Sequence, residues 1–547
     1  MPENPTLSTP LPSGARRLVD HPTAMVLLVC AIHLIVWGAM SARWAPMSPD
    51  DSLEQVLLSQ EWRLEYGKHP PLPTWILYAV ARVFGPSIGA TFVLGALCAV
   101  ATMLLLYVFA RPLIGAPRAA VAAMLASNVV YMNAGTAYFN HNTLQLPLAI
   151  LAIALFHRAL TRMRAQGSAG PPQASLTPSG GGPDLVRPWG HSVDWALFGL
   201  GCGLMMLAKF SAVILFASFG VYLAWTRRFG EAAIWRGLAI AIACCAAVVA
   251  PYELTIRFDA VAPDAYAKDA IFPDDMSRLE RLKSVYGFAS SQLAKVAPAL
   301  IVFFIVRRGA PRAAPRTGER VALGPFLTIV GFGPLVLTVI VAALSGARLL
   351  VNWGTSFHVL LTLWLVAAMP FAIDAPPPVV RRTAVVGIAM QLILWTVLTL
   401  QGGRLPNLNP TPHPVPLPMS EALPETIQRL WAEHCTTPLR YVLTDVNTGA
   451  SLALRWHGQP RAVDGTRPER ARFFSDQARE SVGGMVVLPR PPAIAASGAA
   501  PLPLDDLYRS ATSPSKIELP LKDGRKRDYY FGVLVPSAAS AASACKR

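Results

Sequence analysis

The stretch PDDSLEQVLLSQEWRLEYGKHPPLPTW (Pro49–Trp75) separates the first long apolar run of the chain from the next one. Its carboxylates belong to Asp50, Asp51, Glu54, Glu61 and Glu65, and it ends in the turn Lys68-His69-Pro70-Pro71. Acidic side chains held at the edge of a membrane are costly to desolvate, which makes them candidate functional residues by default. We therefore expect an acidic loop at a membrane surface, with the rest of the chain built around it.

The composition indicates an integral membrane protein. Of the 547 residues, 53% are hydrophobic and only 15% are charged. Apolar runs of about 18 residues or more predict transmembrane helices. By this criterion the chain is mainly α-helical, with about eleven spans. They cover residues 24–42, 91–110, 119–137, 143–160, 193–225 (two spans), 237–254, 285–306, 321–344, 355–371 and 383–400.

The run 193–225 is too long for one span and somewhat short for two. Lys209 interrupts this run, and arginines flank both of its ends. A hairpin of two short helices with Lys209 at its outer tip satisfies both observations. The apolar segment 70–84 is also short, and we expect it to lie at the membrane interface or partly inside the membrane.

The charge distribution predicts the orientation. The formal net charge is +16, and Arg and Lys accumulate in cytoplasmic loops. With the spans above, every arginine cluster falls on one side. The N-terminus is then cytoplasmic, and the acidic loop and all residues from Gln401 onward lie outside. No basic stretch is interleaved with aromatic residues, so nucleic acid is not an expected partner. The predicted location is the bacterial inner (plasma) membrane, with a periplasmic C-terminal domain.

Four regions follow from this organisation. Residues 1–23 form a cytoplasmic N-terminal tail, and residues 24–400 form a transmembrane domain with outer loops at 43–71 and 255–284. Residues 401–418 are a stiff Pro-rich linker, and residues 419–547 form a small extracytoplasmic α/β domain. In that domain we expect helices over 421–435 and 449–457 and strands over 440–444, 484–488 and 529–535.

The cysteines do not form a metal-binding pattern, because no Cys-x-x-Cys sequence occurs. Five of them lie in apolar runs, where a free thiol behaves as a small hydrophobic group. Cys435 and Cys545 lie in the polar C-terminal part and could pair in an oxidising compartment.

The acidic loop resembles that of the GT-C superfamily of membrane glycosyltransferases. The likeness is closest to the bacterial relatives of the protein O-mannosyltransferases, which include the lipid A aminoarabinose transferases. It rests on the acidic pair in Asp50-Asp51-Ser52-Leu53-Glu54-Gln55 and on Lys68-His69-Pro70-Pro71-Leu72 before the next apolar run. Further support comes from Leu207-Ala208-Lys209-Phe210, and from Arg348 with Asn352-Trp353.

The resemblance implies transfer of a sugar from a polyprenyl-phosphate donor to a lipid, glycan or protein acceptor of the cell envelope, with inversion at the anomeric carbon. It implies that Asp51 is the acid/base centre, with Asp50 as a weaker candidate. Asp51 could also be a solvated helix cap. Glu54 lies one helical turn further on and could share their face, although an exposed face is an equal alternative.

Three cations are candidates for the donor phosphate. Lys68 could serve as a point charge and Arg348 as a bidentate clamp, with Lys209 as a third candidate. Each could instead be an interfacial side chain that extends toward the headgroups. His69 is expected to shape the turn or donate a hydrogen bond.

The chain departs from the family pattern at one position. Where the family commonly has a second aspartate, this chain has Asn142, in Phe139-Asn140-His141-Asn142. An amide cannot act as a base. Asn140 and Asn142 could hydrogen-bond to sugar hydroxyls, and Asp259 or Asp269 could supply the missing acid. The sequence identifies no certain cofactor. Asp50, Asp51 and His141 could together hold a divalent cation.

Two other classes of function stay open at this point. A transporter or flippase of lipid-linked sugars would also need many spans, although transporters built on repeats place charges and broken helices near the midplane. Here the acidic residues concentrate in the outer loops instead. A scaffold role for the C-terminal domain is the third alternative.

Overall fold

The computed structural model describes residues 21–44, 50–66, 69–134, 138–167, 190–258, 271–272, 276–313, 319–368, 371–400, 419–456, 458–466, 474, 483–492, 503–522, 524–535 and 545. The chain divides into two compact units. The first comprises Met1–Ser41, Val93–Pro251 and Lys268–Pro410, and the second comprises Ala42–Phe92, Tyr252–Ala267 and Thr411–Arg547.

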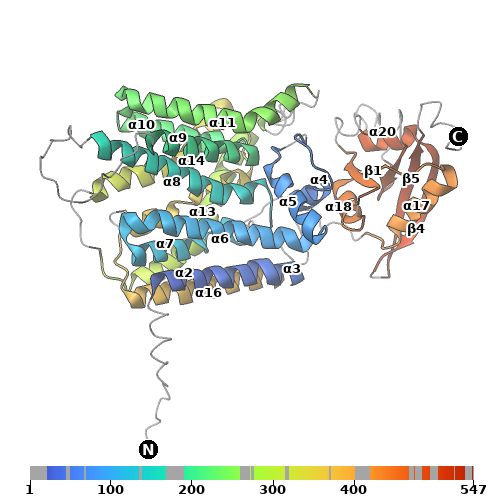
Figure 1. Ribbon diagram of the computed structural model, residues 1–547. Helices are drawn as coiled ribbons and strands as arrows, with labels where there is room; N and C mark the ends of the chain where they lie inside the picture. Colours follow the sequence, from blue (N-terminus) through green and yellow to red (C-terminus); the bar gives the residue numbers. More distant parts are fainter. Residues whose placement is uncertain are drawn as a thin grey trace, which may run out of the picture. The chain divides into compact units, whose positions relative to one another are not determined.

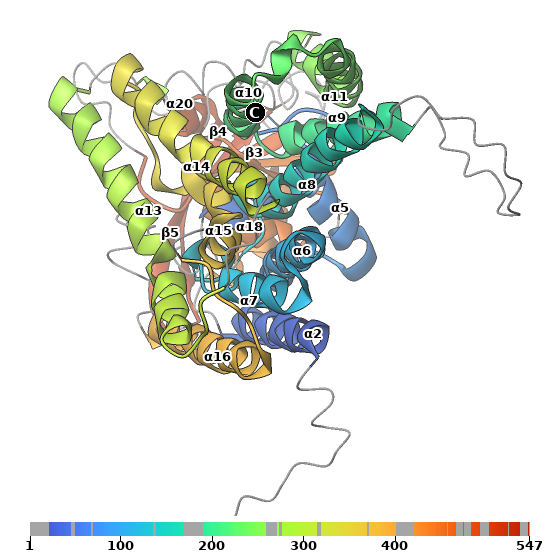
Figure 2. The same cartoon turned by 90° about the vertical axis from the view of Figure 1, so that its left-hand side faces the viewer.

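The first unit is helical. Its elements are α2 (Pro22–His33), the π-helix η1 (Leu34–Met40), most of α6 (Ile88–Ile114), α7 (Ala116–Ala126), the short 3₁₀ turn η2 (Val130–Met132), α8 (His141–Gly167), α9 (Gly190–Ala208), α10 (Ala212–Trp225), η3 (Arg228–Gly230), most of α11 (Ala232–Phe258), α13 (Arg278–Arg307), α14 (Glu319–Ser345), η4 (Val351–His358), α15 (Leu361–Ala367) and α16 (Pro377–Leu400). Helices α2, α7 and α16 pack against one another, as do α8 with α9 and α10 with α14 (Figures 1 and 2).

The polytopic helical fold predicted from the sequence is confirmed. Among the described residues, seven helices are long and apolar enough to cross a membrane, and four shorter apolar helices accompany them. The predicted hairpin over 193–225 is present as α9 and α10, with Lys209 in the turn between them. Gly199 and Gly203, spaced four apart on α9, let α11 approach closely. A Cβ at Gly203 would lie only 2.7 Å from Cβ of Val248.

Two predicted spans differ in the structure. Where a span over 119–137 was expected, α7 ends at Ala126, because polar side chains replace the next helical hydrogen bonds. Asn133 Nδ2 donates to the carbonyl of Ser127 (2.7 Å), and Ser127 Oγ donates to that of Met124 (2.7 Å). Instead of one helix over 355–371, the chain forms the 3₁₀ segment η4 and the short helix α15.

The second unit combines the acidic segment with the C-terminal α/β domain. Its helices are α3 (Ser41–Trp44), which begins at the boundary between the units, α4 (Asp50–Leu58), α5 (Leu72–Phe84), α17 (Leu423–His434), α18 (Val446–Ala453) and α20 (Pro503–Ser510). The sheet has the order β2-β1-β3-β5-β4, formed by β2 (Arg461–Asp464), β1 (Tyr441–Thr444), β3 (Gly484–Leu488), β5 (Lys526–Leu534) and β4 (Thr512–Pro520). Strand β1 is parallel to β2 and β3, whereas β5 is antiparallel to β3 and β4.

The predicted strand over 484–488 is present with the same bounds, and those over 440–444 and 529–535 differ by a few residues. The sequence did not predict β2, α20 or β4. The core under the sheet includes Leu443, Val486 and Leu504, each at most 2% exposed. Cys435 and Cys545 form a disulfide bond across 110 residues of sequence.

Candidate active site

The acidic segment, expected as a loop, contains the helix α4. Asp50 begins this helix, where negative charge is favoured by the helix dipole. Asp51 is half-buried, and Glu54 on the next turn is only 4% exposed. Each of these two residues has an interaction partner in the folded chain. A buried carboxylate beside a partly exposed one gives this helix the acid groups that an acid/base reaction needs.

The segment after α4 turns back on itself. The Tyr66 hydroxyl donates to the carbonyl of Glu61 (2.8 Å) and accepts from the N–H of Arg63 (2.9 Å). Indole Nε1 of Trp75 donates to the carbonyl of Arg63 (2.7 Å). Lys68 lies outside the described residues. His69 is half-buried just before Pro70 and Pro71, and α5 begins at Leu72.

In the helical unit, the structure brings Asn142 and Lys209 together. The Lys209 ammonium donates to Oδ1 of Asn142, and the two side chains are 8% and 3% exposed, respectively. Asn142 lies in the first turn of α8, and Lys209 lies between α9 and α10. A buried cation is therefore held by the side-chain amide of Asn142.

Asn140 has a local structural role. Its Oδ1 accepts from the backbone N–H groups of Asn142 (2.9 Å) and Thr143 (3.0 Å). This arrangement satisfies two donors at the N-terminus of α8, as an N-cap residue does. It thereby fixes the backbone that presents Asn142 to Lys209.

Arg348 lies in the connection between α14 and η4 and is half-buried. Its backbone N–H donates to the carbonyl of Ile271 (2.8 Å). The carbonyl of nearby Gly346 accepts from the Arg281 guanidinium (2.8 Å). This part of the chain is thus fixed through its backbone. The other acids proposed from the sequence, Asp259 and Asp269, lie outside the described residues.

A buried polar cluster in the helical unit was not predicted. Lys295 of α13 is 1% exposed, donates to Oδ1 of Asn352 (3.0 Å) and lies 4.2 Å from the centre of the Tyr131 ring. Gln292 Oε1 accepts from the hydroxyl of Tyr131 (2.9 Å) and lies 3.1 Å from Nε2 of His358. Lys295 and Gln292 are polar residues three apart within an otherwise apolar span, and that signal could have identified them.

The same cluster explains the irregular segment η4. The carbonyl of Val351 accepts from the Tyr131 hydroxyl (2.6 Å) and from Gln292 Nε2 (3.1 Å). Side chains of other elements thus satisfy a backbone group that a regular helix would have paired internally.

No group of three or more His, Cys, Asp or Glu side chains within the described residues is placed to hold a metal ion. The cation site considered from the sequence also needs Asp50, whose side chain is not among those described.

Comparisons with known proteins agree with this architecture. Residues 68–169 match the family model of the dolichyl-phosphate-mannose-protein mannosyltransferases. In three dimensions the chain is similar to crystal structures of ArnT from Cupriavidus metallidurans, in the apo state and bound to undecaprenyl phosphate. Both give a TM-score of 0.57 at 14% identity, and the alignments cover 96% and 95% of this chain and 99% of ArnT. The chain has the ArnT fold. A comparison with curated protein sequences finds no match.

The resemblance to the GT-C superfamily inferred from the motifs is thereby confirmed. The family match begins at Lys68 and spans α5 to α8, so it includes His69, Asn140 and Asn142. The ArnT fold extends the likeness over nearly the whole chain, including the C-terminal α/β domain.

Proposed function

We propose that this chain is a membrane glycosyltransferase that moves a sugar from a polyprenyl-phosphate donor to a cell-envelope acceptor. The observation that carries the proposal is the family match over residues 68–169, because it covers the Lys68-His69-Pro70-Pro71 turn and the helix α8, which carries Asn142. The ArnT fold supports it, since one of the ArnT structures holds undecaprenyl phosphate, a lipid carrier of this class.

The reaction would be a single displacement at the anomeric carbon. The acceptor oxygen forms a bond to that carbon while the bond to the donor phosphate oxygen breaks, which inverts the configuration. A hydroxyl acceptor gives its proton to the Asp51 carboxylate, whereas an acceptor that is already anionic needs only to be oriented by it. We propose Asp50 as the alternative acid and Glu54 as a substrate-binding residue of the same helix.

The leaving group is the polyprenyl phosphate, which gains negative charge as the bond breaks. Cationic side chains aimed at that charge lower the barrier. Lys68 and Arg348 are proposed for this role, with Lys209 holding Asn142 so that its amide meets the sugar hydroxyls. The bound species would thus be one lipid-linked sugar and one lipid, glycan or protein acceptor.

We place the reaction at the outer face of the bacterial inner membrane, with the N-terminus in the cytoplasm and the C-terminal domain in the periplasm. The arginine distribution supports this orientation. The Cys435–Cys545 disulfide supports it independently, because disulfides persist in oxidising compartments such as the periplasm.

The test combines mass spectrometry of envelope lipids and glycans with one matched pair of variants. Cells that express the chain should carry a sugar modification that is missing from cells without it, and Asp51→Asn should abolish this modification. Glu433→Gln is the control, because it also converts a carboxylate to an amide but lies in an exposed ion pair of α17. Near-normal transfer by Asp51→Asn in a correctly inserted chain would contradict the proposed role of Asp51. Movement of lipid-linked sugar between leaflets without any transfer product would instead indicate a flippase.

A further inference from the structure

The helix α4 presents two different faces. With 3.6 residues per turn, Asp51, Glu54 and Leu58 lie on one side, and Leu53 and Leu57 lie on another. Leu53 and Leu57 are at most 7% exposed. The acid groups and the packing groups of this short helix are therefore separated, so contacts on the packing face can set the position of the acid face.

The packing face meets the C-terminal domain at Gly449, in the first turn of α18. A Cβ at this position would lie 3.0 Å from Cδ1 of Leu57. That separation is closer than ordinary van der Waals contact, so a side chain at residue 449 would have to displace the end of the Leu57 side chain. Gly449 thus leaves room for Leu57 where α4 packs on α18.

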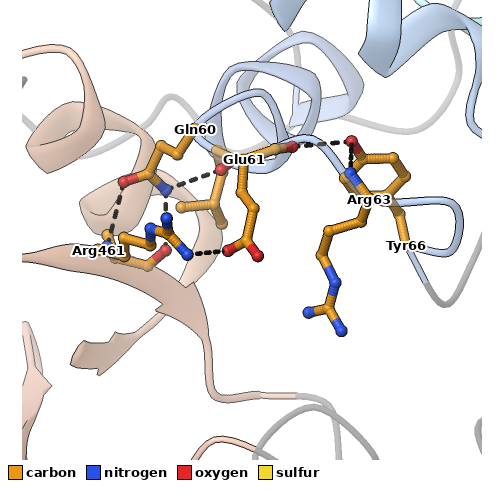
Figure 3. A network of polar contacts seen from close by, with 7 residues as sticks. Gln60, Glu61, Arg63, Tyr66 and Arg461 are labelled. Atoms are coloured by element: carbon orange, nitrogen blue, oxygen red, sulfur yellow. Dashed lines mark hydrogen bonds and ion pairs between the residues drawn. The ribbon is translucent and has the colours of Figure 1, made fainter. Parts of the chain in front are cut away.

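Gln60, just after α4, pairs with the edge of the sheet (Figure 3). Its Nε2 donates to the carbonyl of Ala462 (2.9 Å), and its Oε1 accepts from the N–H of the same residue (3.2 Å). Ala462 belongs to β2, which is an edge strand and so has backbone groups that no neighbouring strand satisfies. The side-chain amide thus makes the two hydrogen bonds that another strand would make.

Two charged contacts extend this attachment. The carboxylate of Glu61 forms an ion pair with the guanidinium of Arg461, the first residue of β2 (Figure 3). The guanidinium of Arg63 lies 5.7 Å from the centre of the Phe474 ring. Gln60, Glu61 and Arg63, just after the end of α4, are therefore attached to residues about 400 positions later in the sequence.

On its other side, α4 is attached to α5. The hydroxyl of Thr74 donates to Oε1 of Gln55 (2.9 Å), and both side chains are at most 2% exposed. Gln55 follows Asp51 by one helical turn. The carboxylate of Asp51 is thus carried by a helix that α5 fixes on one side and that α18 and β2 fix on the other.

We propose that the C-terminal α/β domain positions the acid-bearing helix α4 for sugar transfer, through Gln60, Gly449 and Arg461. The assignment rests on the proposed function, because it names what the transfer reaction requires of this domain. These three residues are positioning residues that act through α4. A misplacement of a reacting group by about 1 Å costs about 100-fold in rate, so loosening this attachment should lower kcat more than it raises KM for the donor.

The test uses the full chain in lipid nanodiscs and measures transfer together with hydrogen exchange. Gln60→Leu removes both hydrogen bonds at similar volume, and Gly449→Leu displaces Leu57. Each should lower kcat by about 10- to 100-fold with KM for the donor within about twofold. Arg461→Glu should also lower kcat, and adding Glu61→Arg should restore most of it, because the reversed pair can re-form. Arg509→Ala is the control, since it removes an exposed ion pair of the same domain.

Hydrogen exchange gives a readout that does not depend on activity. In Gln60→Leu the amide of Ala462 should exchange faster, because its acceptor is gone, while amides of the central strand β3 stay protected. Faster exchange with unchanged kcat would overturn the positioning role, and so would unchanged exchange at Ala462. Absence of transfer by the unsubstituted chain with normal exchange protection would overturn the proposed function, and the assignment with it.

Discussion

The ammonium group of Lys209 donates a hydrogen bond to the side-chain oxygen of Asn142, and both side chains are buried in the helical unit. A buried cation needs hydrogen-bond acceptors around it, because it has lost its water. The amide supplies one of them without neutralising the charge. The pair therefore places a positive charge beside the first turn of α8, which lies within the part of the chain that the family model matches.

Replacing Asn142 tests that relationship. Asn142→Leu should destabilise the chain by about 1–3 kcal/mol, because Lys209 loses a buried acceptor. Asn142→Asp should be at least as stable as the wild type, since it offers an anionic acceptor, and it should keep transfer activity. Thermal unfolding in detergent and a transfer assay measure both effects. Thr161→Val, which alters an exposed local hydrogen bond on α8, is the control. A fully stable Asn142→Leu chain would contradict this account.

The pair Lys295 and Asn352 should be energetically coupled. Lys295→Met leaves Asn352 without its donor and removes a cation from the Tyr131 ring, an interaction of about 2 kcal/mol when desolvated. Asn352→Leu removes the other partner. The double variant should be less destabilised than the sum of the two single variants, with a coupling of about 0.5–3 kcal/mol from a double-mutant cycle of unfolding free energies. Strict additivity would show that the hydrogen bond does not hold η4 to α13.

Charge reversal should separate donor binding from chemistry. Lys68→Glu and Arg348→Glu should each raise KM for the polyprenyl-phosphate donor by about tenfold, because one phosphate contact is replaced by repulsion. Steady-state kinetics at several donor concentrations measure the change. Arg381→Glu, at the start of α16 in a predicted cytoplasmic cluster, should leave KM unchanged. An unaltered KM in both test variants would leave Lys68 and Arg348 as interfacial anchors.

The disulfide should stabilise the C-terminal domain and report its location. Cys545→Ser should destabilise this domain by about 2–5 kcal/mol, since the bond closes a loop of 110 residues. Thermal unfolding with and without reductant measures the effect.

After reduction of whole cells, a membrane-impermeant maleimide with access only to the periplasm should label Cys435 and Cys545. The free cysteines Cys30, Cys98 and Cys202 lie within the apolar helices α2, α6 and α9 and should stay unlabelled. Labelling only after the inner membrane is opened would contradict the proposed orientation.

Local patterns predicted those parts of the fold that depend on nearby residues. Lys209 within an apolar run of excessive length predicted the α9–α10 turn, and the apolar run 484–488 predicted β3. The local structure at these positions depends on a few neighbouring residues, through the length of the apolar run and the charges within it. The acid pair at Asp50 and Asp51 was proposed in the same way, from its place at the end of the first span, and its catalytic role stays a prediction.

Other features depend on partners far away in the sequence. Nothing near Gln60 indicates that its amide pairs with Ala462, and nothing near Val351 indicates that Tyr131 and Gln292 satisfy its carbonyl. The prediction of one span over 355–371 was wrong for this reason. The segment is as apolar as a transmembrane helix, but side chains of other elements bind the backbone of Val351 just before it. The polar residues Gln292 and Lys295 within an apolar span were the sequence feature that indicated a buried polar cluster.

Ionisation of Tyr66 should destabilise the segment after α4 at high pH. Burial raises the pKa of the Tyr66 hydroxyl from 10.0 to about 12, and the nearby Glu61 carboxylate adds to that shift. Because the folded chain holds this proton more tightly than the unfolded chain, the contribution is fully present below pH 10.0 and is lost as the pH rises to about 12. Its size is at most about 2–3 kcal/mol.

Alkaline titration of the folded chain tests this limit by the absorbance of tyrosinate. The Tyr66→Phe variant should lack one of the late ionisation steps, because the hydroxyl that donates to the carbonyl of Glu61 has gone. It should also lose less stability than the wild type between pH 10.0 and about 12. Tyr286→Phe, which removes a tyrosine that is 77% exposed, should keep the late step. If the titrations of the wild type and Tyr66→Phe differ only near pH 10.0, Tyr66 ionises like an exposed tyrosine and the turn after α4 is open to water.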